Sequence, residues 1–277
     1  MPAPTSDGGD VPSLVVRDAL SPLLSHPETS AVLTDFDGTL SPIVKNPYEA
    51  RPLDGAAEVL VRLARRFGEV AVISGRSVAY LEEHLAPADP PDPAHRIRLV
   101  GLYGLEQSWG DGRVTPEPEA MAWQEVVDAA ASRLQGGAPD GVLVEPKGMA
   151  VTVHWRRAPE AEGWVTRAVA AEVERGGLRA HPGRLSVELR PPLDVDKGSV
   201  VRDLVGPLSA ACYFGDDLGD LPAFEALAAL RTQGLHTVSV AVVDDESDPL
   251  VAATADLAVS GQREAVDALA WLATATG

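Results

Sequence analysis

The stretch from Ala31 to Leu40, AVLTDFDGTL, decides how the rest of the chain is interpreted. Its apolar start is typical of a buried strand, and the glycine after its second acid is typical of the turn that ends one. A single residue separates Asp35 from Asp37, so a turn here would bring both carboxyl groups toward one point. Two close carboxylates repel unless a cation or a proton lies between them. The pair therefore indicates a hard metal ion such as Mg²⁺, a nucleophile with its acid–base partner, or both; a solvated Asp-Gly turn is the alternative.

The composition argues against several classes of partner. The chain has 277 residues, enough for two domains of ordinary size or one large one, and 45% of them are apolar, which is enough for a substantial core. Its net charge of −18 disfavours nucleic acid and anionic membranes, because both need a basic surface. There is no signal-peptide pattern, and the single cysteine, Cys212, fits a reducing compartment and a place in the core. We expect a cytoplasmic protein, and a monomer, with no nucleic-acid or membrane partner.

Strands and helices alternate on both sides of a central segment. Apolar runs predict buried strands at 31–35, 70–73, 97–101, 210–214, 237–243 and 256–259. Helical spacing predicts helices at 53–67, 78–85, 197–205, 218–230 and 263–272. Strands separated by helices of this length form βαβ units. They predict an α/β fold with a Rossmann-like parallel sheet and helices on both faces.

The central segment, 109–190, differs from the rest of the chain in composition and in the order of its predicted elements. It contains four of the five tryptophans, which we expect in its core rather than as platforms for a sugar. Its pattern predicts two helices and three short strands, at 119–134, 142–144, 149–155, 160–175 and 185–189. Such an order predicts an inserted α+β domain with helices on one side of a small sheet. The expected division is an N-terminal tail and short helix at 1–30, a core at 31–108 and 191–277, and the insert at 109–190.

Polar side chains follow several of the predicted strands or begin the next helix. In an open parallel sheet, ligands bind beyond the carboxyl ends of the strands. The set, in chain order, is Asp35, Asp37, Ser74, Lys197, Asp216, Asp217 and Asp220. Carboxylates this dense need a divalent cation, and a lysine beside them suits a phosphate oxygen. A nucleophile, a metal and cations around the phosphoryl oxygens are most of what phosphoryl transfer requires.

The order of these motifs resembles the haloacid dehalogenase phosphatase superfamily, with DFDGTL at 35–40 and GDDLGD at 215–220. Finer features are similar to the trehalose-6-phosphate phosphatase family: SGR at 74–76, GLYGLE at 101–106, EPK at 145–147, HWR at 154–156 and ELRP at 188–191. The resemblance covers about 31–225, including the insert, which in such enzymes is a cap over the active site. Leu221 departs from it, since many relatives carry an acid there. The three aspartates before Leu221 remain, so we expect metal binding to be retained.

The resemblance implies a role for each core residue. Asp35 would attack phosphorus and form an aspartyl-phosphate. Asp37 would protonate the leaving sugar oxygen and later activate water. Ser74 and Lys197 would hold phosphoryl oxygens. Mg²⁺ is the implied cofactor, bound by Asp35, the Asp37 carbonyl and Asp216, with Asp217 and Asp220 in support.

The resemblance also implies a sugar phosphate, trehalose 6-phosphate, as the substrate. The implied sugar ligands are Arg76, Glu145, Lys147, Arg156, Glu188 and Arg190; of these Arg190 is a weaker candidate, as is His154. The alternative for the charges of the insert is ordinary salt bridges on exposed strands. Rival functions are a phosphatase for sucrose phosphate or a glycosyl-glycerol phosphate, and a catalytically silent sugar-phosphate-binding domain. The presence of every core acid argues against the silent domain.

Overall fold

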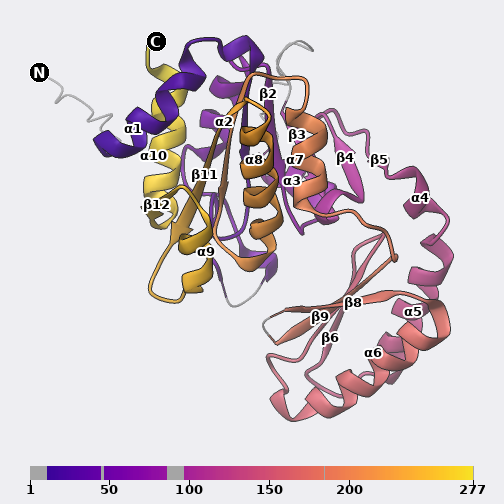
Figure 1. Cartoon of the computed structure of the whole chain (residues 1–277). Helices are drawn as coiled ribbons and strands as arrows, with labels where there is room; N and C mark the ends of the chain where they lie inside the picture. The colour runs from indigo at the N-terminus through magenta and orange to yellow at the C-terminus, as the bar shows by residue number, and fades with distance from the viewer. Residues whose placement is uncertain (1–10, 45–46, 86–96, 184, 277) are drawn as a thin grey trace, which may run out of the picture.

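The computed structural model describes residues 11–44, 47–85, 97–183 and 185–276. Among these residues the larger sheet has eight strands, in the order β12-β11-β10-β1-β2-β3-β4-β5 (Figure 1). From β12 to β3 every neighbouring pair is parallel. These strands are β1 (Ser30–Thr34), β2 (Glu69–Ile73), β3 (Arg98–Gly101), β10 (Ala210–Gly215), β11 (His236–Val243) and β12 (Leu257–Ser260). The predicted α/β fold with a mainly parallel sheet is confirmed.

Helices cover both faces of this sheet, because successive strand residues point to opposite sides. Val32 and Val72 lie in one apolar layer, and Leu33 and Ile73 lie in the other. The first layer is completed by α1 (Leu14–Leu20), α2 (Ala56–Ala64), α3 (Val78–Leu85) and α10 (Gly261–Thr274). The second layer is completed by α7 (Lys197–Val205), α8 (Leu221–Thr232) and α9 (Pro249–Thr254). Cys212 is buried in the first layer, as predicted.

Some elements begin or end where the pattern did not predict. The helix expected at 53–67 is shorter, because Gly55 before it has a φ of +85°, outside the helical region. The helix expected at 218–230 opens as a separate 3₁₀ turn, η6 (Leu218–Asp220), before α8. Pro222 lies in the first turn of α8, where its missing N–H is not needed. Helix α9 has no counterpart in the prediction. The short helix expected before residue 30 is α1, and the expected tail at 1–10 lies outside the described residues.

The larger sheet continues into the segment expected to be the insert. β4 (Glu106–Ser108) pairs antiparallel with β3, and β5 (Thr115–Pro116) pairs antiparallel with β4. Neither strand was predicted, because both are short and lack an apolar alternation. The expected start of the insert at residue 109 therefore falls between two strands of this sheet. We propose that the inserted domain begins beyond Pro116.

A smaller, antiparallel sheet has the order β6-β7-β9-β8. Its strands are β6 (Leu143–Pro146), β7 (Val151–His154), β8 (Arg179–Gly183) and β9 (Ser186–Arg190). One face is apolar and packs against α5 (Gln124–Gly137) and α6 (Glu162–Gly176), and Trp123, Trp155 and Trp164 are part of that layer. β8 escaped prediction because its sequence, RAHPG, contains a proline and only one apolar side chain besides it.

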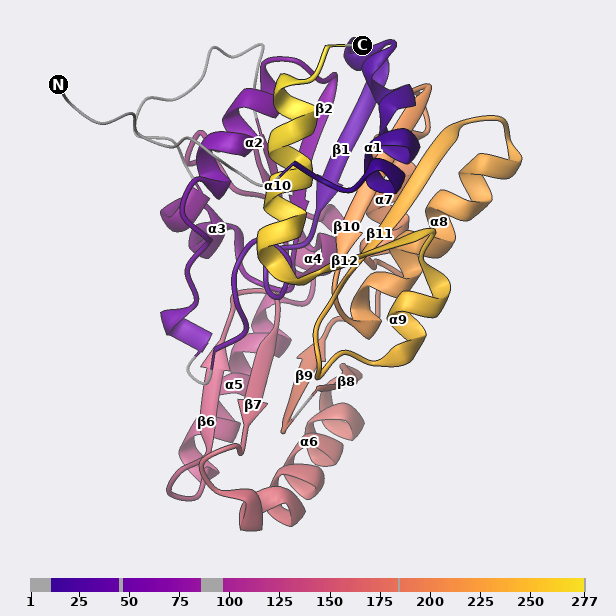
Figure 2. The same cartoon turned by 90° about the vertical axis from the view of Figure 1, so that its left-hand side faces the viewer.

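The chain passes between the two sheets twice. It leaves the larger sheet after β5 through α4 (Pro118–Met121), and it returns from β9 to α7. Prolines lie at both passages: Pro116 and Pro118 at the first, Pro191 and Pro192 at the second. Figures 1 and 2 show the smaller sheet and its two helices as a separate layer beyond one end of the larger sheet. Within the described part of the chain, no helix has the length and apolar character needed to cross a bilayer.

Candidate active site

Asp35 directly follows β1, at the carboxyl end of the sheet. Its N–H donates to the carbonyl of Phe214 in β10 at 2.8 Å, so the parallel ladder continues one residue beyond the strand. The chain then turns through Gly38, whose φ of +76° favours glycine. A Cβ atom on Gly38 would lie 1.9 Å from Oδ2 of Asp216. The glycine therefore allows the Asp216 carboxylate to lie directly against the turn that carries Asp35 and Asp37.

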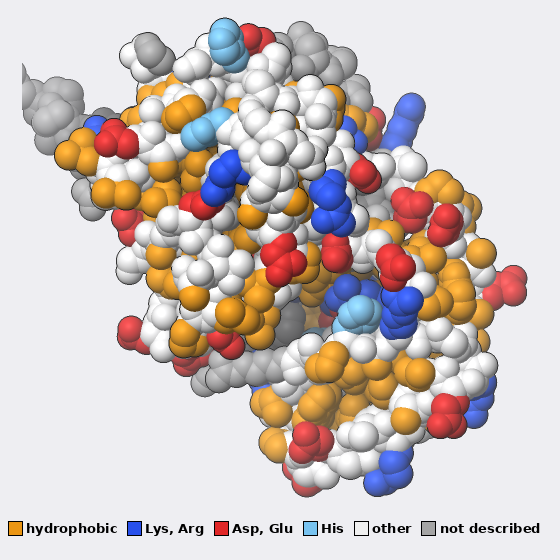
Figure 3. Space-filling view, in the orientation of Figure 1, with side chains coloured by type: hydrophobic (Ala, Val, Ile, Leu, Met, Phe, Trp, Pro, Cys, Tyr) orange, Lys and Arg blue, Asp and Glu red, His pale blue; other side chains and the backbone are white. Residues whose placement is uncertain are grey.

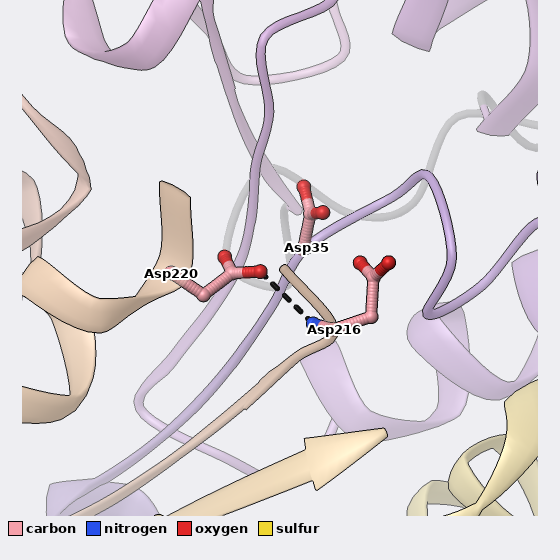
Figure 4. Close-up of side chains that lie close together, drawn as sticks. All are labelled: Asp35, Asp216 and Asp220. Atoms are coloured by element: carbon pink, nitrogen blue, oxygen red, sulfur yellow. Dashed lines mark hydrogen bonds between the residues drawn. The ribbon is translucent and has the colours of Figure 1, made fainter. Parts of the chain in front are cut away.

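Three carboxylates meet beyond β1 and β10. Asp35, Asp216 and Asp220 each place one oxygen within 4.8 Å of the others (Figure 4). Burial, followed by the neighbouring acids, raises the pKa of Asp216 to about 10. Burial also raises the pKa of Asp35 well above its ordinary value, although Lys197 opposes the rise. Oxygen ligands whose negative charge is uncompensated suit a hard divalent cation, so the donor set fits the expected metal.

Both carboxylate oxygens of Asp220 accept hydrogen bonds from other groups of the protein. Its Oδ1 accepts from Lys197 Nζ at 2.5 Å and from the Tyr213 hydroxyl at 2.6 Å. Its Oδ2 accepts from the N–H groups of Asp216 and Asp217, at 2.9 and 3.1 Å. A carboxylate offers about four lone-pair sites, and these four bonds use them. Asp220 therefore shapes the loop and holds Lys197.

Asp217, expected among the metal ligands, is exposed, whereas Asp216 is half-buried and Asp220 is buried. Its Oδ1 accepts the N–H of Gly219 at 2.8 Å, and it is not part of the cluster formed by Asp35, Asp216 and Asp220. Sequence spacing could not distinguish Asp217 from Asp220, because the η6 turn decides which side chain folds back under the loop.

Lys197 is the first residue of α7, after the capping residue Asp196. Its ammonium lies 3.0 Å from Oδ1 of Asp35 and is almost completely buried. Burial acts to lower the pKa of Lys197, but Asp220 and Asp35 outweigh burial and raise that pKa well above its ordinary value. The side chain is therefore a fixed positive charge beside Asp35, where the sequence predicted a phosphate-binding group.

Ser74 and Arg76 occupy the turn after β2, as expected from SGR. The buried Ser74 hydroxyl accepts the N–H of Arg76 at 3.2 Å. The Arg76 guanidinium donates to both oxygens of Asp37, from Nε and Nη2, each at 2.6 Å. It also lies over the ring of Tyr80, 4.5 Å from the centroid. Arg76, expected as a sugar ligand, thus holds the carboxylate expected to act as acid and base, a contact between residues 39 apart that the sequence did not suggest.

The second face of the smaller sheet is charged. Strand register places Glu145, Thr152 and Glu188 side by side. Glu188 accepts from Lys147 Nζ at 3.1 Å, from the Thr152 hydroxyl at 2.9 Å, and from Arg190.

Two more observations complete this face. His154 contacts Glu145 at 2.9 Å. Burial would raise the pKa of Glu188, but Lys147 and Arg190 outweigh it and lower that pKa; His154 and Lys147 do the same for Glu145. Both carboxylates are therefore ionised, each beside a basic partner.

The charged face meets the end of the larger sheet. Figure 3 shows basic, histidine and acidic side chains gathered where the two parts of the molecule meet. The Arg190 guanidinium lies 3.5 Å from the ring centroid of Tyr103, in the segment after β3. Of the six expected sugar ligands, Glu145, Lys147, Glu188 and Arg190 lie on this face, whereas Arg76 contacts Asp37. The exposed Arg156 lies two residues beyond the end of β7, and its role stays a prediction.

Known proteins share this sequence and this fold. The sequence profile of the trehalose-phosphatase family matches residues 33–260. The chain belongs to the trehalose-phosphatase family. It is 39% identical over 220 residues to the trehalose-phosphate phosphatase of Mycolicibacterium paratuberculosis, a match that covers 76% of this chain and 54% of that protein. This member of the family thus spans about half the length of that curated relative.

Two solved structures have the same fold. A trehalose-6-phosphate phosphatase related protein superposes with a TM-score of 0.73 at 22% identity, covering 88% of this chain and 96% of the other. The C-terminal domain of C. albicans trehalose-6-phosphate phosphatase gives 0.70 at 23% identity, covering 96% and 99%. The family predicted from the sequence motifs is confirmed. A phosphatase family of the haloacid dehalogenase type implies a divalent metal, which the carboxylate cluster fits.

Proposed function

We propose that this member of the trehalose-phosphatase family hydrolyses trehalose 6-phosphate to trehalose and phosphate. The observation that carries the proposal is that two chemically different sites face each other. Asp35, Asp216 and the buried Lys197 can bind and transfer a phosphoryl group. The charged face around Glu145 and Glu188 offers the groups that bind sugar hydroxyls. A phosphorylated disaccharide needs both sites.

Asp35 is the proposed nucleophile. One of its oxygens attacks phosphorus, the bond from phosphorus to the sugar oxygen breaks, and trehalose leaves behind an aspartyl-phosphate. Water then attacks that phosphorus and releases phosphate, which restores the Asp35 carboxylate. Lys197 and the Ser74 hydroxyl hold the phosphoryl oxygens and offset the charge on them.

Asp37 is the proposed acid in the first step and base in the second. Its bidentate pair with Arg76 uses one lone-pair site on each oxygen and fixes the orientation of the carboxyl group. On this proposal Arg76 orients Asp37 and does not bind the sugar.

The metal assignment follows from the donor set. Asp35 and Asp216 would hold a divalent cation together with the Asp37 carbonyl, and Asp217 and Asp220 would shape the loop around it. The donors are all oxygens, with no cysteine or histidine among them, which favours Mg²⁺ over zinc. When bound, the cation would offset the negative charge of the phosphoryl oxygens.

A substrate panel tests the proposal. Phosphate release is measured in the presence of Mg²⁺ from trehalose 6-phosphate, sucrose phosphate, a glycosyl-glycerol phosphate and p-nitrophenyl phosphate. We expect the highest kcat/KM for trehalose 6-phosphate. A higher value for another sugar phosphate would replace the substrate. Binding of sugar phosphates without turnover of any ester would instead support a silent binding domain.

A further inference from the structure

Tyr103 has an unusual backbone conformation beside the candidate active site. Leu102 and Tyr103 have φ values of +50° and +60°, in the left-handed region that residues with a Cβ atom rarely adopt. The N–H of Tyr103 donates to the carbonyl of Ser74, and the N–H of Leu102 donates to the carbonyl of Arg76, both at 2.9 Å. The strained turn is therefore fixed to the loop that carries Ser74 and Arg76. Backbone strain that the surrounding structure maintains is typical of functional positions.

One side of the Tyr103 ring borders the phosphoryl site. A Cβ atom on Gly75 would lie 2.6 Å from both Cζ and the hydroxyl oxygen of Tyr103, so the end of the ring covers this glycine. A Cβ atom on Gly219 would lie 3.8 Å from Cε1 of the same ring. Lys197 Nζ is 5.9 Å from the ring centroid. The ring thus lies between the loops that follow β2 and β10, next to the lysine.

The ring also contacts the charged face of the smaller sheet. Arg190 lies 3.5 Å from its centroid, Arg190 donates to Glu188, and Glu188 accepts from Lys147 at 3.1 Å. An aromatic face attracts a cation, and more strongly where water is excluded. Burial, with Glu188 in support, raises the pKa of the Tyr103 hydroxyl, so the ring stays neutral. Contacts therefore run without a break from Lys197 through Tyr103 to Arg190 and Glu188.

We infer that Tyr103 is a positioning residue for sugar recognition: its ring seats Arg190 and thereby orients Glu188 toward the phosphoryl site. The inference rests on the proposed function, because it assigns Glu188 to the sugar. Tyr103 would act through Arg190 and not through its own contact with the phosphorus. It would therefore matter for a sugar phosphate and not for a small aromatic ester.

A double-mutant cycle tests the inference, with kcat and KM measured for trehalose 6-phosphate and p-nitrophenyl phosphate. Tyr103→Leu should lower kcat/KM for the sugar phosphate by between about twofold and about 30-fold, the range of a cation–π contact. It should leave p-nitrophenyl phosphate unchanged. Tyr103→Phe keeps the ring and should behave like wild type on both substrates. In the Arg190→Met background, Tyr103→Leu should cost nothing further.

Trp109→Leu is the matched control. It removes another contact of an arginine with a ring, with Arg98 at 3.8 Å, beside the amino ends of β2 and β3. This variant should leave both substrates unchanged. Additive losses in the double mutant, or equal losses on both substrates in Tyr103→Leu, would overturn the inference. If Tyr103→Leu does not fold, ring-fluorinated phenylalanines at position 103 provide a second test. They keep the shape of the ring and weaken, step by step, the attraction of its face for the Arg190 cation. A graded loss supports the inference, and an unchanged kcat/KM overturns it.

The proposed function and this inference fail in different ways. A wrong substrate shows in the wild-type protein, as turnover of p-nitrophenyl phosphate without turnover of trehalose 6-phosphate. The cycle is then repeated with the best sugar phosphate of the panel. If the wild type hydrolyses no sugar phosphate at all, both fail. A wrong role for Tyr103 shows only in the variants, against a wild type that behaves as proposed.

Discussion

Asp220 and Glu188 are buried carboxylates at the centres of the two facing sites, and each is bonded to a lysine. Around Asp220 the acids outnumber the bases, and burial with neighbouring acids raises the pKa values of Asp35 and Asp216. Around Glu188 the basic groups outnumber the other acids. Burial opposes ionisation there too, but the adjacent basic groups outweigh burial and lower the pKa of Glu188. In the first site Lys197 alone does not balance the acids, whereas the second site supplies enough positive charge of its own.

This difference determines what each site can bind. The site at the end of the larger sheet needs a cation from outside, and with that cation it can hold a phosphoryl group. The charged face of the smaller sheet can exchange its internal hydrogen bonds for sugar hydroxyls with no change in net charge. Damage to the first site should therefore affect every phosphate ester, and damage to the second should affect sugar esters alone.

The largest effect should come from Asp35→Asn, which keeps the shape of the side chain but removes the attacking charge. Turnover of trehalose 6-phosphate and of p-nitrophenyl phosphate should fall by about 10⁴-fold or more, as for other covalent nucleophiles. The measurement is phosphate release with Mg²⁺, and circular dichroism checks that the variant is folded. Substantial turnover by the folded variant would remove Asp35 from the mechanism.

Variants of the charged face should affect trehalose 6-phosphate and p-nitrophenyl phosphate differently. Each charge-assisted hydrogen bond contributes roughly 1.5–3 kcal/mol, so Glu145→Ala, Lys147→Ala or Glu188→Ala should lower kcat/KM for trehalose 6-phosphate by about 10- to 100-fold. The same variants should barely affect p-nitrophenyl phosphate. Lys197→Ala is the comparison, because it should depress both. If the variants of the charged face lose kcat/KM equally on both substrates, or on neither, the charged face is structural. That result would contradict its assignment to the sugar.

Arg76→Lys should have a smaller effect that depends on the leaving group. Lysine cannot reproduce the two-pronged contact with Asp37, so Asp37 loses its orientation while the positive charge remains. We expect kcat for the sugar phosphate to fall about tenfold, part of what general acid catalysis supplies. p-Nitrophenolate leaves without a proton, so the kcat of its ester should fall less, because only the second step, which both substrates share, needs Asp37 as a base. A rise in KM for the sugar with unchanged kcat would instead restore Arg76 as a sugar ligand.

The smallest effect should appear in stability. The raised pKa of Asp216 means that the folded, metal-free protein holds a proton that the unfolded chain releases. Stability from this group is present at low pH and is lost as the pH rises toward about 10. Asp216→Asn should therefore raise the Tm of metal-free protein by a few degrees at about pH 8. The gap should widen between about pH 5 and about pH 9.

Thermal melts with and without Mg²⁺ complete this test. Mg²⁺ should raise the Tm of the wild type, because it binds the folded state, and it should raise that of Asp216→Asn much less. Chelation should abolish turnover by the wild type, and added Mg²⁺ should restore it. Equal Mg²⁺ stabilisation of the two proteins, or full activity after exhaustive chelation, would contradict the metal assignment.

The parallel part of the fold could be predicted because its physical signal is local. Buried strands such as β1 are continuous apolar runs, and α3 and α7 have the predicted bounds because their apolar faces repeat at helical spacing. β5 and β8 carried no such signal. Their place is decided by pairing with β4 and β9, so only the folded chain defines them.

Prediction of the site from sequence has the same limit, because only local patterns can be recognised. Position at the ends of strands identified Asp35, Ser74 and Lys197, because strand ends in a parallel sheet share one edge. The partners of those residues depend on contacts between distant segments. No spacing rule joins Arg76 to Asp37, selects Asp220 to anchor the loop after β10, or places Tyr103 under Arg190.

The prolines at the two passages between the sheets affect the entropy of binding. Proline fixes φ, so the backbone at Pro116 and Pro118 and at Pro191 and Pro192 has fewer rotatable bonds than an ordinary linker of that length. A joint with few conformers loses little chain entropy when a ligand that touches both sheets fixes their arrangement. More of the free energy of the proposed sugar contacts would then remain as affinity.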